Sequence, residues 1–411
     1  MSNYRVSEHT KTHSPFVFQP VSGAKVKALW KLARKHGIAE KRWFRFGYIL
    51  VLSLLCAPFK LIERHTYDRS LRNYTPEKNP IIILGHWRSG TTHLHNILCK
   101  DPENTYYSTY KAWAPHHFML TERWLKPFID PLIPKERPMD KVALSAEEPQ
   151  EEEFALANLG PHSFYHGMYF NDSIDDYFDR YVSYRLADTK AYEGWKNDYS
   201  YLINKLSFAT KGKRVIAKNP ANTARIDALL ELYPNAKFVH ISRNPYKVYA
   251  STVNLYNSLG YAFGLGKPWK KNIEDIVLRH YRTVMMSYLS KRHLIPKENL
   301  IDIRYENFIK DEVGTLEMIY KRFDIDRFEE AKPHFQSYLD SIGSFEKNSF
   351  ELDAESIQQV SKNWQFAFER LRYPHKNAYT RHNPDVEETK RYHEELKSEA
   401  PESQMEPELS T

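Results

Sequence analysis

The sequence predicts an α/β fold with a central parallel sheet and helices on both of its faces. Short, continuous apolar runs recur along the chain, as is typical of strands buried in a parallel sheet. Each run is followed by a longer segment with helical periodicity, and glycine, proline and asparagine mark the junctions. With 411 residues, the chain is long enough for one large domain with appendages.

The expected strands and helices alternate from residue 81 onward. We expect strands at Ile81–Leu84, Arg214–Ala217, Lys237–Ile241 and Leu300–Arg304, and helices at Thr92–Leu98, Ala221–Tyr233, Pro245–Leu255, Ile273–Leu289 and Leu316–Phe323. The segment Lys111–Pro161 has no clear period before Glu151–Leu159, and we expect it to be an insertion of helices and loops over the functional face of the sheet.

Three parts of the chain differ in composition. Residues 1–79 are expected to form a helical extension, in which Ala24–His36 has the pattern of an amphipathic surface helix. Residues 80–384 are expected to form the α/β domain. Residues 385–411 are acidic and polar, and we expect them to be a mobile tail.

One apolar run, Phe46–Phe59, lies between basic residues on both sides. A membrane-spanning helix needs roughly 20 apolar residues, and this run is shorter. We therefore favour a helix that is buried or lies on a membrane surface over one that spans the membrane.

The charge and the cysteine content exclude several classes of protein. A formal net charge of +7 suits an anionic ligand, but no nucleic-acid-binding signature accompanies it. Cys56 and Cys99 cannot build a disulfide framework or a cysteine-based zinc site, and Met1–Pro20 lacks the apolar core of a signal peptide. We expect a cytoplasmic protein that does not bind nucleic acid, with a peripheral membrane contact through Phe46–Phe59 left open.

Residues 85–92, GHWRSGTT, have the G-x-x-x-x-G spacing of a phosphate-binding loop, between an expected strand and an expected helix. P-loop enzymes that hydrolyse ATP or GTP have a lysine after the second glycine, where Thr91 stands here. The remaining backbone N–H groups, two hydroxyls and one guanidinium suit a single diester-like phosphate. A simple glycine turn is the alternative.

Two further motifs follow expected strands. Residues 238–245, FVHISRNP, place Arg243 at a strand end and Ser251 about two turns into the next helix. Residues 215–220, VIAKNP, place Lys218 at another strand end. Ligands of open α/β sheets bind at the carboxyl ends of the strands, so we expect these residues to share a site. The alternative is that they are ordinary surface residues.

Together, these motifs resemble those of sulfotransferases that use 3′-phosphoadenosine-5′-phosphosulfate (PAPS), in particular the broad bacterial group related to tyrosylprotein-type members. Residues 81–98 resemble the family's 5′-phosphosulfate loop, residues 243–251 resemble its 3′-phosphate motif, and residues 301–308, IDIRYENF, resemble a later strand. The resemblance implies a nucleotide-kinase-like, three-layer fold with a P-loop-like motif, PAPS as co-substrate and no metal.

The resemblance also implies roles for individual residues. The donor would contact Arg88, Ser89, Gly90, Thr91 and Thr92 through its 5′ group, and Arg243 and Ser251 through its 3′-phosphate. Arg88 and Lys218 would stabilise charge on the transferring group, and a guanidinium can bind two oxygens at once.

The residue that accepts the proton is the least defined. Many cytosolic relatives have a histidine shortly after the strand lysine, but Asn219 and Pro220 stand there in this chain. Residues 146–156, AEEPQEEEFAL, resemble an acidic element of bacterial relatives, so we expect Glu151 or Glu153 to be the base. Two residues apart on a helix point about 200° apart, so one of them is expected to face the donor. The alternative is a solvated acidic helix N-terminus.

The function expected from these features is transfer of a sulfuryl group from PAPS to an acceptor hydroxyl by in-line displacement. The apolar run and the many aromatic residues favour a lipid or another hydrophobic alcohol as acceptor, while carbohydrate and peptide acceptors stay open. The alternative functions are an ATP-dependent small-molecule kinase of the same fold and a non-catalytic nucleotide-binding relative.

Overall fold

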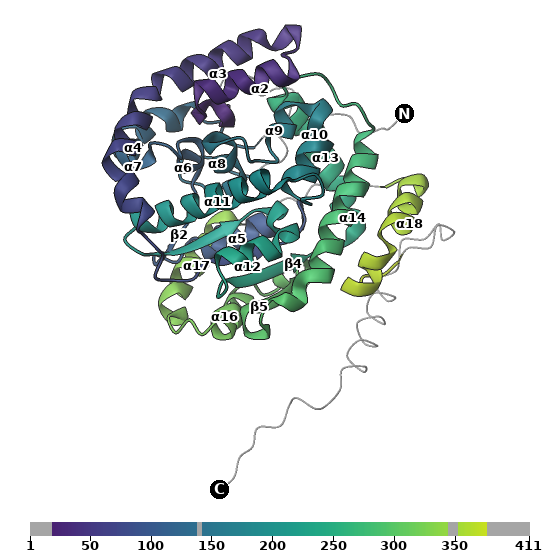
Figure 1. The fold of residues 1–411 in the computed structure, drawn as a ribbon. Helices are drawn as coiled ribbons and strands as arrows, with labels where there is room; N and C mark the ends of the chain where they lie inside the picture. The colour runs from purple at the N-terminus through teal and green to yellow at the C-terminus, as the bar shows by residue number, and fades with distance from the viewer. Residues whose placement is uncertain (1–18, 138–141, 344–351, 376–411) are drawn as a thin grey trace. The chain divides into compact units, whose positions relative to one another are not determined.

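The computed structural model describes residues 19–137, 142–343 and 352–375 (Figure 1). The chain forms two compact units, one from Met1–Arg243 with Lys247–Phe350 and one from Asn244–Tyr246 with Glu351–Thr411. The larger unit contains the sheet. In the smaller unit, helix α18 (Ala354–Leu371) is the main described element. The acidic tail expected at residues 385–411 lies outside the described residues.

A five-stranded parallel sheet forms the centre of the larger unit, which confirms the predicted fold class. Its strand order is β2-β3-β1-β4-β5. The strands are β1 (Ile81–Leu84), β2 (Asn104–Thr105), β3 (Arg214–Lys218), β4 (Lys237–Ser242) and β5 (Leu300–Arg304). The central strand β1 is fully buried, which explains why its four residues are all apolar. The short edge strand β2 was not predicted.

Alternate residues of the strands support different layers of helices, as the pleat requires. On one face, Ile83, Val239 and Ile303 belong to a core that packs against α5 (Thr91–Leu98), α16 (Glu312–Arg322) and α17 (Phe328–Ile342). On the other face, His240 stacks on Tyr288 of α14 (Ile273–Lys291), with ring centres 3.8 Å apart. Helices therefore cover both faces.

The prediction of a single helix at Ala221–Tyr233 is wrong. The segment forms a 3₁₀ turn, η5 (Pro220–Ala224), and a short helix, α12 (Ile226–Leu232). Arg225 separates them with φ −106° and ψ 22°. Its buried side chain donates to the Tyr181 carbonyl oxygen at 2.7 Å, so a tertiary contact holds the backbone at this break. The helix predicted from Pro245 is longer than expected and continues to Phe263 as α13.

The segment between β2 and β3 is mostly helical. It contains α6 (Thr109–Trp113), α7 (Phe118–Ile129), η3 (Asp130–Leu132), α8 (Glu152–Leu159), α9 (His166–Tyr169), η4 (Asn171–Ser173), α10 (Ile174–Tyr181) and α11 (Thr189–Ala209). The remaining described elements of the larger unit after α14 are η6 (Arg292–Leu294), η7 (Lys297–Asn299) and α15 (Tyr305–Phe308).

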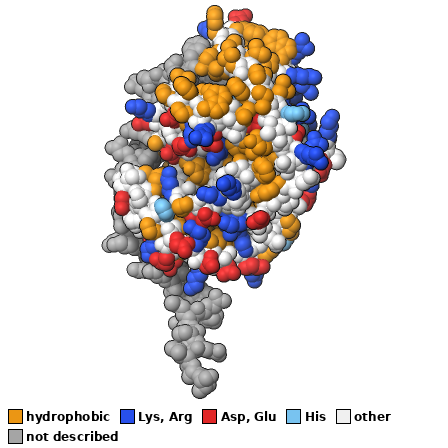
Figure 2. All heavy atoms as spheres, turned by 90° about the vertical axis from the view of Figure 1, so that its left-hand side faces the viewer, with side chains coloured by type: hydrophobic (Ala, Val, Ile, Leu, Met, Phe, Trp, Pro, Cys, Tyr) orange, Lys and Arg blue, Asp and Glu red, His pale blue; other side chains and the backbone are white. Residues whose placement is uncertain are grey.

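The N-terminal part is helical, with η1 (Pro20–Gly23), α2 (Val26–His36), η2 (Glu40–Arg42), α3 (Trp43–Leu55) and α4 (Ala57–Arg72). The apolar run 46–59 is divided between α3 and α4. None of the described helices is by itself long and apolar enough to cross a membrane, although 40–55 and 57–72 together reach that length and composition with a 40° bend. Figure 2 shows hydrophobic side chains gathered at the top of the face that carries α4 and α7.

A buried ion pair fastens α4 to the rest of the larger unit. The Lys205 ammonium on α11 bonds to the Glu63 carboxylate on α4, and both side chains are almost inaccessible to solvent. Glu63 also accepts a hydrogen bond from the backbone N–H of Leu120 at the start of α7, at 2.8 Å. One carboxylate therefore joins three helices, which lie side by side in Figure 1.

We predict that Lys205→Ala lowers the free energy of unfolding by about 3–5 kcal/mol, because it leaves the Glu63 carboxylate buried without its cation. Lys196→Ala on the same helix is the matched control, since Lys196 pairs with the half-exposed Glu231 and its loss should change stability by less than about 1 kcal/mol. Urea unfolding of both variants measures the difference. Equal losses would contradict a special role for the buried pair.

Candidate active site

The loop between β1 and α5 has a backbone conformation that few residues allow. Gly90 has φ 102° and Arg88 has φ 71°, both in the left-handed region. A Cβ atom on Gly90 would lie 2.2 Å from the ring of Tyr305, so a larger residue does not fit. Gly90 is also the N-cap of α5, whose first N–H groups therefore begin at this loop. Such a helix start favours an anion.

Arg88 and Arg243 lie in contact, although they belong to different motifs. The Nε of Arg88 donates to the Ser251 hydroxyl at 2.7 Å, and Nη1 of Arg243 donates to the carbonyl oxygen of Arg88 at 3.1 Å. The Arg243 guanidinium also stacks on Tyr305, 4.4 Å from the ring centre. Because β1 and β4 are neighbours, their carboxyl ends bring the two motifs together. Two arginines at the same loop favour a ligand with several negative charges.

A cavity of about 1070 Å³ lies beside this loop. The residues expected to bind the donor that line it are Arg88, Gly90, Thr91, Thr92 and Arg243. Glu151 lines the same cavity, and so do apolar side chains from the insertion and from α13, among them Trp113, Phe154, Leu255, Leu259 and Phe263. One cavity therefore joins an anion-binding loop, a carboxylate and an apolar wall.

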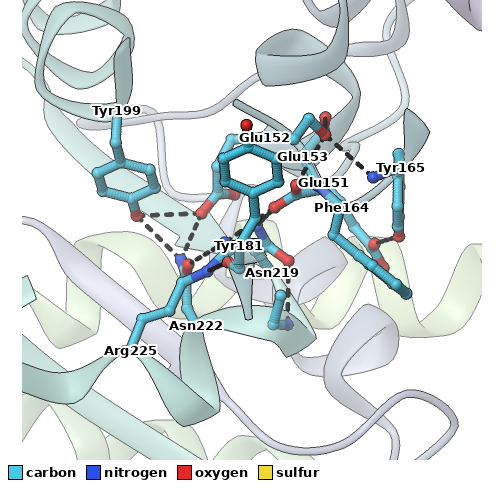
Figure 3. Close-up of polar contacts among 12 residues, drawn as sticks. Glu151, Glu152, Glu153, Phe164, Tyr165, Tyr181, Tyr199, Asn219, Asn222 and Arg225 are labelled. Atoms are coloured by element: carbon cyan, nitrogen blue, oxygen red, sulfur yellow. Dashed lines mark hydrogen bonds and ion pairs between the residues drawn. The ribbon is translucent and has the colours of Figure 1, made fainter. Parts of the chain in front are cut away.

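Three consecutive glutamates at the start of α8 have three different surroundings (Figure 3). Glu151 is the N-cap, and its carboxylate binds the Lys218 ammonium at 2.8 Å and the Tyr165 hydroxyl. Glu152 is buried and accepts from the backbone N–H of Lys218 at 3.0 Å. Glu153 is buried and binds Arg225 at 2.9 Å. Of the three, Glu151 is the one that reaches the cavity.

Glu152 and Glu153 are both buried, but their pKa values shift in opposite directions. Burial raises the pKa of Glu152 to about 7, even though Tyr199 and Lys218 donate hydrogen bonds to it. Burial would also raise the pKa of Glu153, but the Arg225 guanidinium and the amide of Asn219 more than offset this and hold it below its ordinary value. Glu153 is therefore a buried, fully partnered anion and is poorly placed to exchange protons with a ligand in the cavity.

Lys218 lies behind the cavity wall. Its side chain is buried at the carboxyl end of β3, and burial lowers its pKa although Glu151 opposes the shift. Its ammonium contacts Glu151, which lines the cavity. In the same way, Ser251 contacts Arg88, which lines the cavity. Ser89 is also buried, and its hydroxyl has no hydrogen-bond partner among the described residues. A buried hydroxyl of this kind beside a phosphate-type loop is suited to an anionic ligand.

The structure thus gathers the residues singled out from the sequence at one edge of the sheet. Four of them do not line the cavity itself: Ser89, Glu153, Lys218 and Ser251. Tyr305, Tyr165 and Arg225 were not among the site residues predicted from the sequence. Tyr305 belongs to the family-like pattern at residues 301–308. Its stacking on Arg243 could not be predicted, because it depends on β5 lying beside β4 in the sheet. The sequence carries no signal for Tyr165 or Arg225. Among the residues that the structure describes, no group of three or more His, Cys, Asp or Glu side chains could hold a metal ion.

Comparison with known proteins gives a consistent family. A family model described as "Sulfotransferase family" matches residues 80–330. The omega-hydroxy-beta-dihydromenaquinone-9 sulfotransferases Stf3 of Mycobacterium bovis and Mycobacterium tuberculosis are each 32% identical to this chain over 354 residues, covering 86% of this chain and 89% of the relative.

Solved structures show the same fold. Sulfotransferase STF9 from Mycobacterium avium matches with a TM-score of 0.59 at 17% identity, over 85% of this chain and 96% of that one. Sulfotransferase STF1 from Mycobacterium tuberculosis H37Rv matches with a TM-score of 0.56 at 18% identity, over 88% of this chain and 98% of that one.

We predict that Gly90→Ala destabilises the protein by about 1–3 kcal/mol, because the residue must keep a positive φ and its methyl group would displace the Tyr305 ring. Gly47→Ala in α3 is the control, since no atom lies within 4 Å of the position of its Cβ and a helix interior favours alanine. Thermal unfolding should therefore move in opposite directions for the two variants. A neutral Gly90→Ala would show that the loop relaxes freely.

Proposed function

Because this chain belongs to the sulfotransferase family, we propose that it transfers a sulfuryl group from PAPS to the hydroxyl of a hydrophobic alcohol. The observation that carries the proposal is the composition of the cavity. Its anion-binding loop suits the charged donor, and its apolar wall suits the acceptor. Glu151 lines the cavity beside both sets of residues and has the chemistry of a proton acceptor.

The residues at the loop fit a donor with two separate anionic groups. The N–H groups at the start of α5, the Ser89 hydroxyl and Arg88 would hold the 5′-phosphosulfate. Arg243 and Ser251 would hold the 3′-phosphate, as the family motif implies. The contact of Arg243 with Tyr305 and with the Arg88 carbonyl oxygen orients its guanidinium before any ligand arrives. This preorganisation lowers the entropic cost of binding.

The chemistry of the donor is a transfer at sulfur, in which the bond from sulfur to the phosphate oxygen breaks as a bond to the acceptor oxygen forms. Arg88 stabilises negative charge on the transferring group. Glu151 takes the proton of the acceptor hydroxyl. The Lys218 ammonium, 2.8 Å from the Glu151 carboxylate, holds that carboxylate in position. The family resemblance also implies a charge-stabilising role for Lys218.

The apolar wall supports a lipid acceptor. Trp113, Phe154 and Phe263 offer a surface for rings or isoprenoid chains, and Leu255 and Leu259 extend it along α13. The relatives that are 32% identical act, by their names, on an omega-hydroxylated dihydromenaquinone. We propose a hydroxylated lipid of comparable chemistry as the acceptor of this chain.

We predict that adenosine 3′,5′-bisphosphate binds without magnesium, and that Arg243→Ala weakens this binding about 10- to 100-fold through the loss of a charged hydrogen bond. Isothermal titration calorimetry measures it, with AMP and with ATP plus magnesium as control ligands. Arg282→Ala, an exposed position on α14, is the control variant and should bind normally. Preference for ATP with magnesium would instead favour the kinase alternative.

We predict that Glu151→Gln lowers kcat about 10²- to 10⁴-fold and leaves affinity for adenosine 3′,5′-bisphosphate unchanged, because it removes only the proton acceptor. Transfer of radioactive sulfur from PAPS to a panel of hydroxylated isoprenoid quinones and sterols measures the rate. Glu148→Gln, another carboxylate at the cavity, is the control and should retain activity.

Two results would contradict this assignment. Full activity of Glu151→Gln would remove Glu151 as the base. A protein that binds the nucleotide tightly but transfers sulfur to no acceptor would favour the non-catalytic alternative.

A further inference from the structure

Helices α3 and α4 differ from ordinary surface helices, which place charged residues toward solvent and apolar residues toward the core. Several of the charged residues of α3 and α4 point into the protein, and several of their large apolar residues point out. Arg45, Lys60 and Glu63 are buried, whereas Phe44, Leu54, Leu55 and Leu61 are exposed. Charged side chains are almost never fully buried unless they are paired, so this arrangement requires an explanation.

The buried charges are held by specific contacts. Lys60 donates to the carbonyl oxygens of Ala24 at 2.7 Å and Ser53 at 3.3 Å, and Arg45 donates to the carbonyl oxygen of Gly264 at 3.2 Å. Burial lowers the pKa of Lys60 to about 8. The two helices are therefore fixed by polar bonds on their inner sides, which leaves the apolar side chains on the outside.

The exposed apolar side chains continue onto α7. Trp124 of α7 packs edge-on against Phe59 of α4, with ring centres 5.3 Å apart. We call these six residues the apolar face: Phe44, Leu54, Leu55, Leu61, Trp124 and Phe128. They are 46–86% exposed. Figure 2 shows hydrophobic side chains gathered in this region, with Lys and Arg at its borders. A continuous exposed apolar surface of this kind marks an interaction site.

The surrounding charge is strongly positive. Residues 26–72 contain eleven lysines and arginines and three acidic residues, so the formal charge of this segment alone exceeds the +7 of the whole chain. Exposed members include Lys31, Lys41, Arg64 and Arg69. Basic side chains beside an apolar helix surface are the combination that binds anionic lipid headgroups while apolar side chains enter the acyl region.

We infer that the apolar face docks the protein on an anionic lipid bilayer, with α3 and α4 lying in the interface. A spanning arrangement is disfavoured because α3 has 13 residues and its inner side packs on the protein through Phe46 and Ile49. The basic border also disfavours a second copy as the occupant, because it would place like charges opposite each other.

The position of the apolar face has a consequence for the cavity. Phe128 and the exposed Leu132 come directly before Pro134 and Arg137, which line the cavity. The same segment of chain therefore runs from the membrane-facing surface to the cavity wall. A lipid acceptor could then be taken from the bilayer, a step that rests on the proposed function, whereas docking itself does not.

The test is sedimentation of the full chain with sucrose-loaded vesicles, without donor or acceptor, so that its result is independent of catalysis. Vesicles with about 30% phosphatidylglycerol in phosphatidylcholine should bind the protein at least about tenfold better than pure phosphatidylcholine. The variant F44S/L54S/L61S should bind these vesicles at least about tenfold more weakly, because each lost side chain removes buried apolar area.

The control variant is M286S/L294S/M318S, which changes equally large, half-exposed apolar residues on α14, η6 and α16. It should bind like the unaltered protein. Circular dichroism checks that both variants fold. A second measurement leaves Phe44, Leu54 and Leu61 unchanged. Lipids brominated in their acyl chains should quench the tryptophan fluorescence of the unaltered protein, and Trp124→Phe should reduce that quenching.

Three outcomes would overturn the inference. The first is no binding of the unaltered protein to anionic vesicles and no quenching. The second is an equal loss of binding in the two triple variants. The third is a dimer, seen by light scattering, that the F44S/L54S/L61S variant converts to a monomer without any effect of vesicles, which would assign the apolar face to a second copy of the chain.

Discussion

The buried ion pair between Glu153 and Arg225 is the interaction on which the geometry of the site depends. It joins the first turn of α8 to the break between η5 and α12, immediately after β3. Asn219 and the Lys218 backbone N–H add hydrogen bonds to Glu153 and Glu152 in the same region. With two of three consecutive carboxylates bound in the interior, the third, Glu151, is held at the N-cap against the cavity. Removing one partner of such a pair would leave an uncompensated buried charge.

The sheet supplies the other half of the site. The central position of β1 places its carboxyl end between those of β3 and β4. Lys218 is the last residue of β3, Arg243 follows β4, and the loop with Arg88 follows β1. Two contacts then lie at one edge, between Arg88 and Arg243 and between Lys218 and Glu151. The two parts of the fold therefore supply different groups to the site. The sheet edge supplies the cationic groups, and the helical insertion supplies the carboxylate and aromatic rings.

The buried charged residues and the exposed apolar residues of α3 and α4 have a common cause, which is how the two helices are attached to the protein. Lys60, Arg45 and Glu63 fix the helices to the protein by hydrogen bonds and an ion pair, which are directional. Together with the packing of Phe46 and Ile49, these directional bonds fix the rotation of each helix about its axis. The same rotation leaves Phe44, Leu54 and Leu61 facing outward.

The sequence by itself determined the elements and motifs whose signals are local. Four strands, the phosphate-type loop and the positions of Arg88, Lys218 and Arg243 could be predicted, because a buried strand needs a short apolar run and a ligand of an open sheet binds at strand ends. Only the tertiary structure decided which glutamate faces the cavity. Glu151 and Glu153 are chemically identical, and their partners Lys218, Asn219 and Arg225 lie 66 to 72 positions away in the chain. It also decided that helix 221–233 is broken at Arg225, and that the run 46–59 is divided between two helices that meet at a bend. Both features depend on contacts with distant segments that a local period cannot encode.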